Sequence, residues 1–242
     1  YLTKTDGILV ERNTIRVSTR SGIRLNEDCF NNVFKNNNVY FIREYGRSVH
    51  LTESDENKFI NNNLSNNHQG FYLERSDSNN FTGNTILSNE LYGMILRYSS
   101  DNRIYDNEIS SEYGININDC KETKVVRNRI YENKGGLSVH SSEDIYISSN
   151  VLRNNQGNFL GGCINLTFVN NTMINDGIDL VDVYHNKLRN WNTHTIDTSN
   201  TVNGKPVYYW KNREGGEVPS DAGQVILANC TDIKVTDLNL TN

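Results

Sequence analysis

The chain repeats one unit of about 22 residues along most of its length, and this repeat restricts the fold more than any other feature. Residues 79–96, NNFTGNTILSNELYGMIL, show the unit most clearly. Phe81 and Ile86 stand five positions apart, and an Asn precedes each of them by two positions. A Gly then opens a short segment, here called the Gly-strand, in which Met94 and Leu96 share one side.

Equivalent positions recur in register through the sequence. The main Asn column contains Asn13, Asn37, Asn62, Asn84, Asn107, Asn128, Asn150 and Asn171. The Phe81 column contains Phe34, Phe59, Phe81, Ile104, Val125, Ile147, Phe168, Leu188 and Val235. The Ile86 column contains Ile15, Val39, Leu64, Ile86, Ile109, Ile130, Leu152, Met173 and Leu240. The Gly-strand pairs run from Ile23 with Leu25 to Ile178 with Leu180 and Val225 with Leu227.

This pattern predicts an all-β, right-handed parallel β-helix. Each repeat holds three short β-type pieces separated by Asn and Gly, and no piece has helical spacing, which argues against leucine-rich repeats. Strands that pair with their equivalents one turn away stack at roughly 4.8 Å. About nine coils would then form a single domain over residues 1–242, roughly 45 Å long.

The Asn columns have a structural explanation. Asn adopts the left-handed backbone conformation more readily than other non-Gly residues, so we expect it to make the bends between strands. Its amide group both donates and accepts hydrogen bonds, and stacked Asn side chains can form ladders. The Asn-rich composition therefore indicates coil construction rather than a binding motif.

The repeat is interrupted in two places. Asn158 occupies an inward position, where a buried amide needs partners. The repeat between Gly177 and Gly223 is about twice the usual length. Its segment Val202-Asn203-Gly204-Lys205 carries a strong two-residue hairpin signal. We predict a β-hairpin insertion over residues 190–222.

Composition excludes several classes of function. The net charge is −5 with both signs mixed, so no basic stripe indicates nucleic acid. No segment approaches the roughly 18 apolar residues of a membrane helix. The four Cys are widely spaced without a CxxC motif, which favours free thiols. The repeat starts and stops in mid-pattern, so we expect a fragment whose partners include further coils of a longer parent chain.

The repeat resembles the pectin lyase-like β-helix superfamily, with closest likeness to NosD-type and carbohydrate-binding and sugar-hydrolysis domains. The units GFYLERSDSNNFTGNTILSN and GMILRYSSDNRIYDNEI carry this resemblance. The segment at 200–233 also resembles a recurring element of archaeal cell-surface proteins. The likeness implies polysaccharide cleavage or epimerisation, polysaccharide or surface binding, or the copper-site maturation of NosD proteins. It is specific for fold and weak for function.

In related enzymes the substrate lies along the sheet of Gly-strands, so the outward residues of that sheet form the first candidate site. Its central polar residues are Tyr72, Glu74, Arg97, Asn116, Asn118, Asp119 and His140, and Tyr92 and Tyr113 precede their Gly on successive coils. Arg97 can bind a uronate carboxylate, and His140 or Tyr72 can serve as acid or base. The two Tyr rings can stack on sugars. The competing interpretation is an ordinary solvated strand face.

A second candidate site contains Asp176, Asp179 and Asp182. Asp176 and Asp179 resemble the carboxylates of polygalacturonase-type hydrolases, and the three together suggest a Ca²⁺ site. The further motifs of those hydrolases are missing, so these residues can equally be turn Asp. No copper site is predicted, because the five His are scattered and only two Met are present.

We therefore expect an extracytoplasmic repeat domain that binds polysaccharide or forms part of a cell surface. The alternative is a polyuronate lyase, epimerase or glycoside hydrolase with its site on the Gly-strand sheet. A NosD-like copper-maturation accessory protein is the third possibility.

Overall fold

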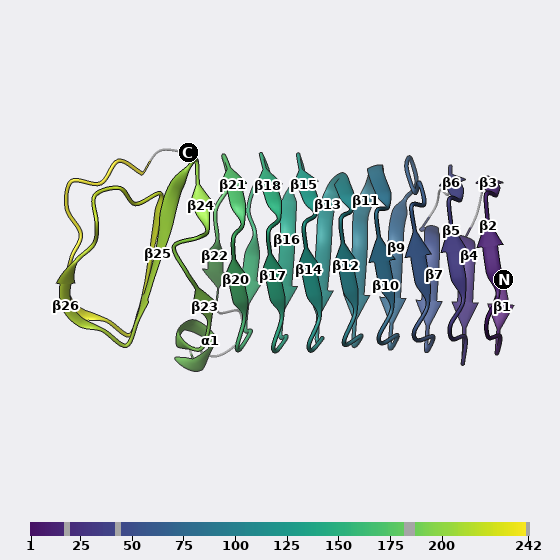
Figure 1. Cartoon of the computed structure of the whole chain (residues 1–242), viewed down its shortest axis with the longest axis horizontal. Coiled ribbons are helices and arrows are strands. Elements are labelled where there is room, and N and C mark those ends of the chain that lie inside the picture. Colours follow the sequence, from purple (N-terminus) through teal and green to yellow (C-terminus); the bar gives the residue numbers. More distant parts are fainter. Residues whose placement is uncertain (17–19, 42–44, 182–186, 241–242) are drawn as a thin grey trace.

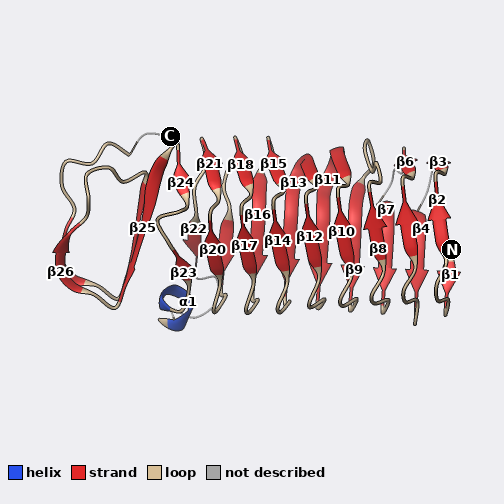
Figure 2. Ribbon diagram, in the orientation of Figure 1, coloured by secondary structure: helices blue, strands red, loops and turns tan. Residues whose placement is uncertain are grey.

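The computed structural model describes residues 1–16, 20–41, 45–181 and 187–240, and these form a parallel β-helix. Figure 1 shows an elongated rod in which successive coils lie side by side from the N-terminus to the C-terminal region. Almost all of its regular structure is strand (Figure 2). The prediction of an all-β solenoid is confirmed.

The first sheet takes one short strand from each of nine coils, close to the expected coil number. Each strand places its central apolar residue inward, as the Phe81 column predicts. Its strands are β2 (Leu9–Glu11), β5 (Val33–Lys35), β8 (Lys58–Ile60), β10 (Asn80–Thr82), β12 (Arg103–Tyr105), β14 (Lys124–Val126), β17 (Tyr146–Ser148), β20 (Thr167–Val169) and β23 (Thr195–Ile196).

The second face follows the Ile86 column. Its strands are β3 (Thr14–Arg16), β6 (Asn38–Tyr40), the start of β11 (Thr85–Arg97), the start of β13 (Glu108–Asn118), β15 (Arg129–Tyr131), β18 (Val151–Arg153), β21 (Thr172–Ile174) and β24 (Thr201–Val202). Both β11 and β13 continue past the corner, so they belong to the Gly-strand sheet as well.

The Gly-strand sheet forms the third face and carries the predicted site. Its strands are β1 (Leu2–Thr3), β4 (Ser21–Asn26), β7 (Arg47–Thr52), β9 (Gln69–Glu74), the ends of β11 and β13, β16 (Gly135–His140), β19 (Phe159–Gly161) and β22 (Asp179–Val181). The pairing is parallel and in register from coil to coil, because each repeat has nearly the same length.

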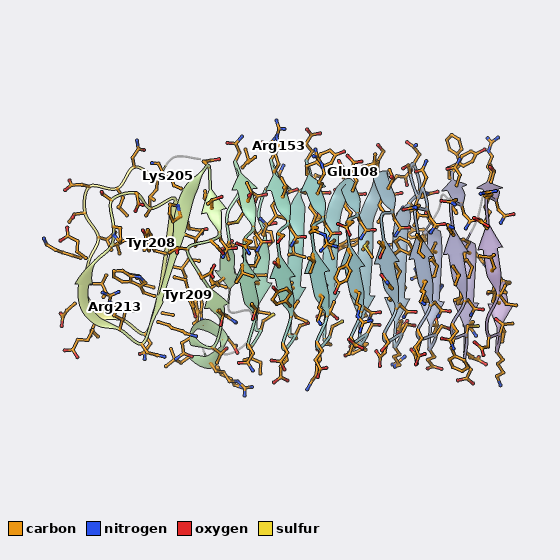
Figure 3. All side chains as sticks on the ribbon, viewed as in Figure 1. Glu108, Arg153, Lys205, Tyr208, Tyr209 and Arg213 are labelled. Atoms are coloured by element: carbon orange, nitrogen blue, oxygen red, sulfur yellow. The ribbon has the colours of Figure 1, made fainter. Side chains whose placement is uncertain are left out.

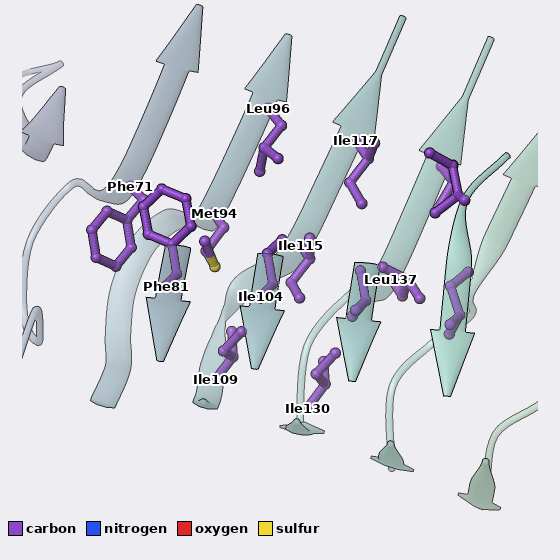
Figure 4. Close-up of a cluster of buried hydrophobic side chains, with 14 of the residues drawn as sticks. Phe71, Phe81, Met94, Leu96, Ile104, Ile109, Ile115, Ile117, Ile130 and Leu137 are labelled. Carbon is purple, nitrogen blue, oxygen red and sulfur yellow. The ribbon is translucent and has the colours of Figure 1, made fainter. Parts of the chain in front are cut away.

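The three faces enclose one apolar core along the rod. Phe34, Phe59 and Phe81 stack as parallel rings, with centroids 4.8 and 5.2 Å apart. Figure 4 shows Phe71, Met94 and neighbouring aliphatic side chains filling the space between the sheets. Stacking equivalent side chains at the strand spacing leaves little void, which close packing of a core requires.

Ladders of polar side chains run along the corners of the rod, among them the main ladder described next and a third ladder that contains Asn133 and Asn155. In the main ladder the Asn84 backbone N and Nδ2 both donate to Oδ1 of Asn107, each at 2.9 Å. The Nδ2 of Asn84 also donates to the Phe59 carbonyl at 2.9 Å. The same arrangement continues through Asn128, Asn150 and Asn171 to Asn200. Buried amides are thus paired, as expected.

The expectation that the ladder Asn residues adopt the left-handed conformation is wrong. From Asn84 to Asn171 the residue before each ladder Asn does so instead, with φ of 67° at Gly83, 57° at Asp106 and 56° at Arg127. That preceding residue makes the bend. The ladder residue keeps a negative φ and turns its side chain inward to bond the next coil.

The Gly at the start of each Gly-strand is explained by close approach between coils. A Cβ added at Gly114 would lie 2.3 Å from the carbonyl oxygen of Gly136, and one added at Gly70 would lie 2.2 Å from that of Gly93. Real Cβ atoms are excluded from such positions. The neighbouring Gly135 is different, because its nearest contact would be 3.4 Å away.

After β22 the structure departs from the predicted columns. Leu188, Val235 and Leu240 are exposed, since the chain enters the short helix α1 (Arg189–Asn192) and later leaves the rod. The columns continue instead at Ile196 and Val202, which pair with Phe168 and Met173.

The predicted hairpin turn at Asn203-Gly204 is present and joins β24 to β25 (Lys205–Lys211) in an antiparallel pair. The strand direction therefore reverses. Parallel partners for β25 and β26 (Glu214–Glu217) come from β27 (Gln224–Ala228) and β28 (Thr231–Lys234). In Figure 1, β25 and β26 lie on opposite sides of an open loop.

This terminal loop is not a continuation of the earlier Gly-strands. The expected inward pair Val225 and Leu227 is wrong, because Ile226 packs against the core and Leu227 is exposed. A shift of one residue in phase moves the opposite side chains of a strand inward, and β27 has that shifted phase relative to the expected pattern. Tyr208, Tyr209 and Arg213 project within this loop region (Figure 3).

We predict that Gly114→Ala destabilises the protein by about 3 kcal/mol, because the new Cβ would force the Gly136 backbone of the next coil to move. Denaturant unfolding measures the effect. Gly135→Ala is the matched control on the neighbouring coil and should change stability by less than about 1 kcal/mol. Equal effects of the two substitutions would contradict the close-approach explanation.

Candidate functional site

One hollow on the Gly-strand sheet brings together most of the residues predicted for the first site. Its volume is about 420 Å³, and we call it the Arg97 hollow. Six of its lining residues were predicted and Ser141 was not; the lining is Tyr92, Arg97, Asn116, Asn118, Asp119, His140 and Ser141.

Strand register explains this assembly. Arg97 pairs with Asn118, and Asn118 pairs with His140, so the three side chains come from adjacent strands of β11, β13 and β16. Two strand spacings, roughly 9.6 Å, therefore separate the backbones of Arg97 and His140.

Two aromatic residues border the hollow at the position before the Gly. The rings of Tyr92 and Tyr113 stack on each other, with centroids 5.1 Å apart and an angle of 29°. Tyr92 lines the hollow and Tyr113 does not. Tyr113 covers one face of the Tyr92 ring. Since only Tyr92 lines the hollow, its ring is the one that a ligand in the hollow would contact.

The charge state of the hollow follows from burial. Burial lowers the pKa of His140 below its usual range, so the imidazole is neutral at pH 7. Arg97 is exposed, and within the described ranges it forms no ion pair with a carboxylate. The hollow thus combines a fixed positive charge, a neutral imidazole and the exposed carboxylate of Asp119.

Tyr72 and Glu74 lie on the strand beside the hollow but do not line it. Tyr72 is only 7% exposed, because Arg47 covers its ring with Cζ 3.7 Å from the ring centroid. The ring of His50 packs against its edge at 5.2 Å. The Tyr72 hydroxyl and ring are therefore largely enclosed, which limits the predicted acid–base role.

Sequence reasoning missed Arg47. It occupies the position before the small residue that opens the Gly-strand, in register with Gln69. Tyr92, Tyr113 and Gly135 hold the equivalent position further along. The register places the predicted outward residues in two columns, one with Tyr72 and Asn116 and one with Arg97 and His140. The column that contains Arg47 is a third, and the Tyr92 and Tyr113 positions were its signal in the sequence.

The second predicted site is largely a structural one. Asp176 is 4% exposed and ends the third ladder, where Asn155 donates to its Oδ2 at 2.6 Å and Asn158 donates to its Oδ1 at 2.7 Å. Burial raises the pKa of Asp176 to about 6. Asn158 also accepts from the Leu137 backbone N at 3.0 Å, so the inward amide has its expected partners.

The predicted calcium site is not assembled by the described residues. Asp179 is exposed, and Asp182 lies outside the described residues. Both carboxylate oxygens of Asp176 already accept from amide groups. In residues 1–16, 20–41, 45–181 and 187–240, no group of three His, Cys, Asp or Glu side chains is arranged to hold a metal ion.

Comparison with protein families then identifies the chain. A family described as "Periplasmic copper-binding protein (NosD)" matches residues 1–215. The chain belongs to the NosD family. No protein in the curated collection matches the sequence.

Three similar solved structures have low sequence identity to this chain. Pectate lyase Pel9A is 13% identical with a TM-score of 0.58, covering 97% of this chain and 62% of the lyase chain. The periplasmic alginate epimerase AlgG T265N mutant is 18% identical, with a TM-score of 0.47. The match covers 97% of this chain and 46% of the epimerase chain. A rhamnogalacturonan lyase is 10% identical, with a TM-score of 0.49. The match covers 96% of this chain and 78% of the lyase chain. The Pel9A match supports the fold alone.

The family description implies copper, for which His, Cys and Met are the favoured ligands. The described residues do not fit this requirement. Met94 and Met173 are fully buried in the core, and the described His and Cys do not gather into a metal-binding group. His185 lies outside the described residues. Within the described ranges no helix is both long and apolar enough to span a bilayer.

We predict that the stability of the wild type relative to Asp176→Asn falls as pH rises from about 4 to about 6. The folded pKa of about 6 lies above the unfolded value of 3.8, so the unfolded state ionises first and gains stability in that window. The change should total about 3 kcal/mol. Denaturant unfolding of both proteins across the window measures it, and a pH-independent difference would contradict it.

Proposed function

We propose that this domain binds polysaccharide along its Gly-strand sheet, with the Arg97 hollow as the main contact. The observation that carries the proposal is that one hollow contains an aromatic ring and a guanidinium from β11 and two amides from the adjacent strand β13. These groups match the parts of an acidic sugar. Tyr rings contact the apolar face of the ring, Asn amides bond hydroxyls, and Arg binds carboxylate.

The regular register favours a polymer over a small isolated ligand. Outward side chains repeat at the strand spacing of roughly 4.8 Å along the sheet. A chain-like ligand that lies along the rod can therefore contact equivalent positions on several coils. Similar contacts summed over several sugar units increase the total affinity without requiring a deep pocket.

The proposal includes an extracytoplasmic location, at a cell surface or in the periplasm. The family description, which names a periplasmic protein, supports this location. We further propose that adjoining coils or domains of a longer parent chain are its structural partners. The first coil and β28 present strand edges that are unpaired within the described residues, and such edges are normally covered.

We predict that Arg97→Ala and Asn118→Ala each weaken binding to polygalacturonate by about tenfold, since each removes a group that bonds the sugar. Isothermal titration calorimetry with a panel of acidic and neutral polysaccharides gives the affinities. Arg153→Ala, on β18 of the second face, is the matched control and should leave them unchanged. Loss of binding in the control but not in the hollow variants would contradict the proposed site.

A second candidate function, proton abstraction from a uronate, is favoured by one observation. A neutral His140 shares the hollow with Arg97. In this reaction the imidazole would remove the proton from the carbon beside the carboxylate, and the Arg97 guanidinium would stabilise the negative charge that develops. In elimination the glycosidic C–O bond beside that carbon would then break, and the leaving oxygen would take the proton from the imidazolium; in epimerisation the carbon would instead regain a proton from water on its opposite face.

We predict for this candidate that the wild type converts a polyuronate and that His140→Ala abolishes conversion, with Arg97→Ala reducing it at least about a hundredfold. Ultraviolet absorbance detects unsaturated products and proton NMR detects epimers. Binding to the polymer without either product, in wild type and variants alike, would restrict the domain to a binding function.

A further inference from the structure

Three guanidinium groups on one part of the Gly-strand sheet lack carboxylate partners. Arg24, Arg47 and Arg97 come from β4, β7 and β11, and none of them belongs to an ion pair within the described residues. Glu74 on β9 is in register with Arg97 and its charge acts on Arg47, so one negative charge accompanies the three positive ones. The remaining positive excess is opposite in sign to the net charge of −5 of the whole chain.

Tyr72 is the centre of this cluster. The Cζ of Arg47 lies 3.7 Å from the Tyr72 ring centroid, and the Cζ of Arg97 lies 6.0 Å from it. Both distances fall within cation–π range. Arg24 is on the preceding coil, where it is in register with His50, and His50 is in register with Tyr72.

The cluster has donors that the protein does not use. The Nε atoms of Arg24 and Arg47 are buried and have no hydrogen-bond partner among the described residues. A guanidinium binds carboxylate or sulfate through two parallel hydrogen bonds, either from Nε with a terminal nitrogen or from its two terminal nitrogens. Because the two Nε atoms are covered by protein, an anion on the sheet would bond terminal nitrogens, and it is the positive charge without an ion-pair partner that indicates an anionic ligand.

His50 does not add a charge to this cluster. Burial first, and then the charges of Arg47 and Arg24, lower the pKa of His50 to about 4. The neutral ring contacts a terminal nitrogen of Arg47 at 3.4 Å and the Thr52 hydroxyl at 3.1 Å. It therefore helps to position Arg47 over Tyr72 without competing for an anion.

We infer that Arg24, Arg47 and Arg97 form an anion track that extends the polysaccharide site from the Arg97 hollow toward the N-terminal coils. The ligand class is a glycan with repeated carboxylate or sulfate groups. Three strand spacings, roughly 14 Å, separate β4 from β11, which leaves room for more than one anionic group. This inference rests on the proposed function, because it specifies the charge of the same ligand.

Arg24→Gln/Arg47→Gln tests the track, since neither residue lines the Arg97 hollow. Binding to polygalacturonate, to heparin and to carboxyl-reduced polygalacturonate is measured by calorimetry at two salt concentrations. We expect the double variant to lose at least about tenfold in affinity for an acidic polymer, with a weaker salt dependence, while affinity for the reduced neutral polymer is unchanged. Heparin and polygalacturonate distinguish sulfate from carboxylate as the preferred group.

Two further variants control for folding and for charge. Arg47→Lys keeps the charge but lacks the planar fork, so its affinity should fall between those of the wild type and the double variant. Arg153→Gln removes a positive charge from another face and should have no effect (Figure 3 labels Arg153). Thermal unfolding confirms that each variant is folded.

The outcomes separate the two proposals. If the wild type binds acidic and neutral polymers equally and the double variant matches it, the track is wrong and polysaccharide binding stands. If the folded double variant also loses affinity for the neutral polymer, the track is wrong as well. The contribution of the two Arg residues to binding would then not depend on the charge of the ligand. If the wild type binds none of the three polymers, the track and the proposed function are both overturned.

Discussion

The asparagine ladder is the interaction on which the rest of the structure depends. Asn84 shows the pattern: its Oδ1 accepts two hydrogen bonds from Asn62 on the coil before it. Its Nδ2 donates to the Phe59 carbonyl, and its backbone N and Nδ2 donate to Asn107 on the coil after it. Since a buried amide without partners is unfavourable, a coil of the wrong height or length would leave a break along the whole column. The ladder therefore keeps coils of 21 to 25 residues in one register.

Function on such a scaffold arises from what the fixed register places side by side. Residues one repeat apart in sequence become neighbours at the strand spacing, which is how Arg97, Asn118 and His140 reach one hollow. The same geometry gathers Arg24, Arg47 and Arg97 although the chain is acidic overall. Turns are short, so the proposed site lies on the sheet face itself and not on long loops.

The end of the rod shows what happens when the ladders stop. The main ladder ends at Asn200 and the third ends at Asp176, whose buried carboxylate accepts from Asn155 and Asn158. An Asp at the end has no donor for a further coil, so it can close a column but cannot continue it. Three residues after Asn200 the Asn203-Gly204 turn reverses the strand direction, and β25 begins a differently arranged loop.

The sequence by itself determined the parallel β-helix, its core columns and the outward columns that carry Tyr72, Arg97, Asn116 and His140, because these follow from a repeat of constant length. It also located the hairpin, since Asn-Gly has strong local turn chemistry. Only the tertiary structure decided which outward residues share a space. It enclosed Tyr72 beneath Arg47, placed Asp176 in a ladder instead of a metal site, and reversed the chain after β24. The first two outcomes depend on side-chain contacts between coils, and the third was expected from the hairpin turn; what the turn did not predict is the parallel pairing of β25 with β27, which places Ile226 and not Leu227 against the core.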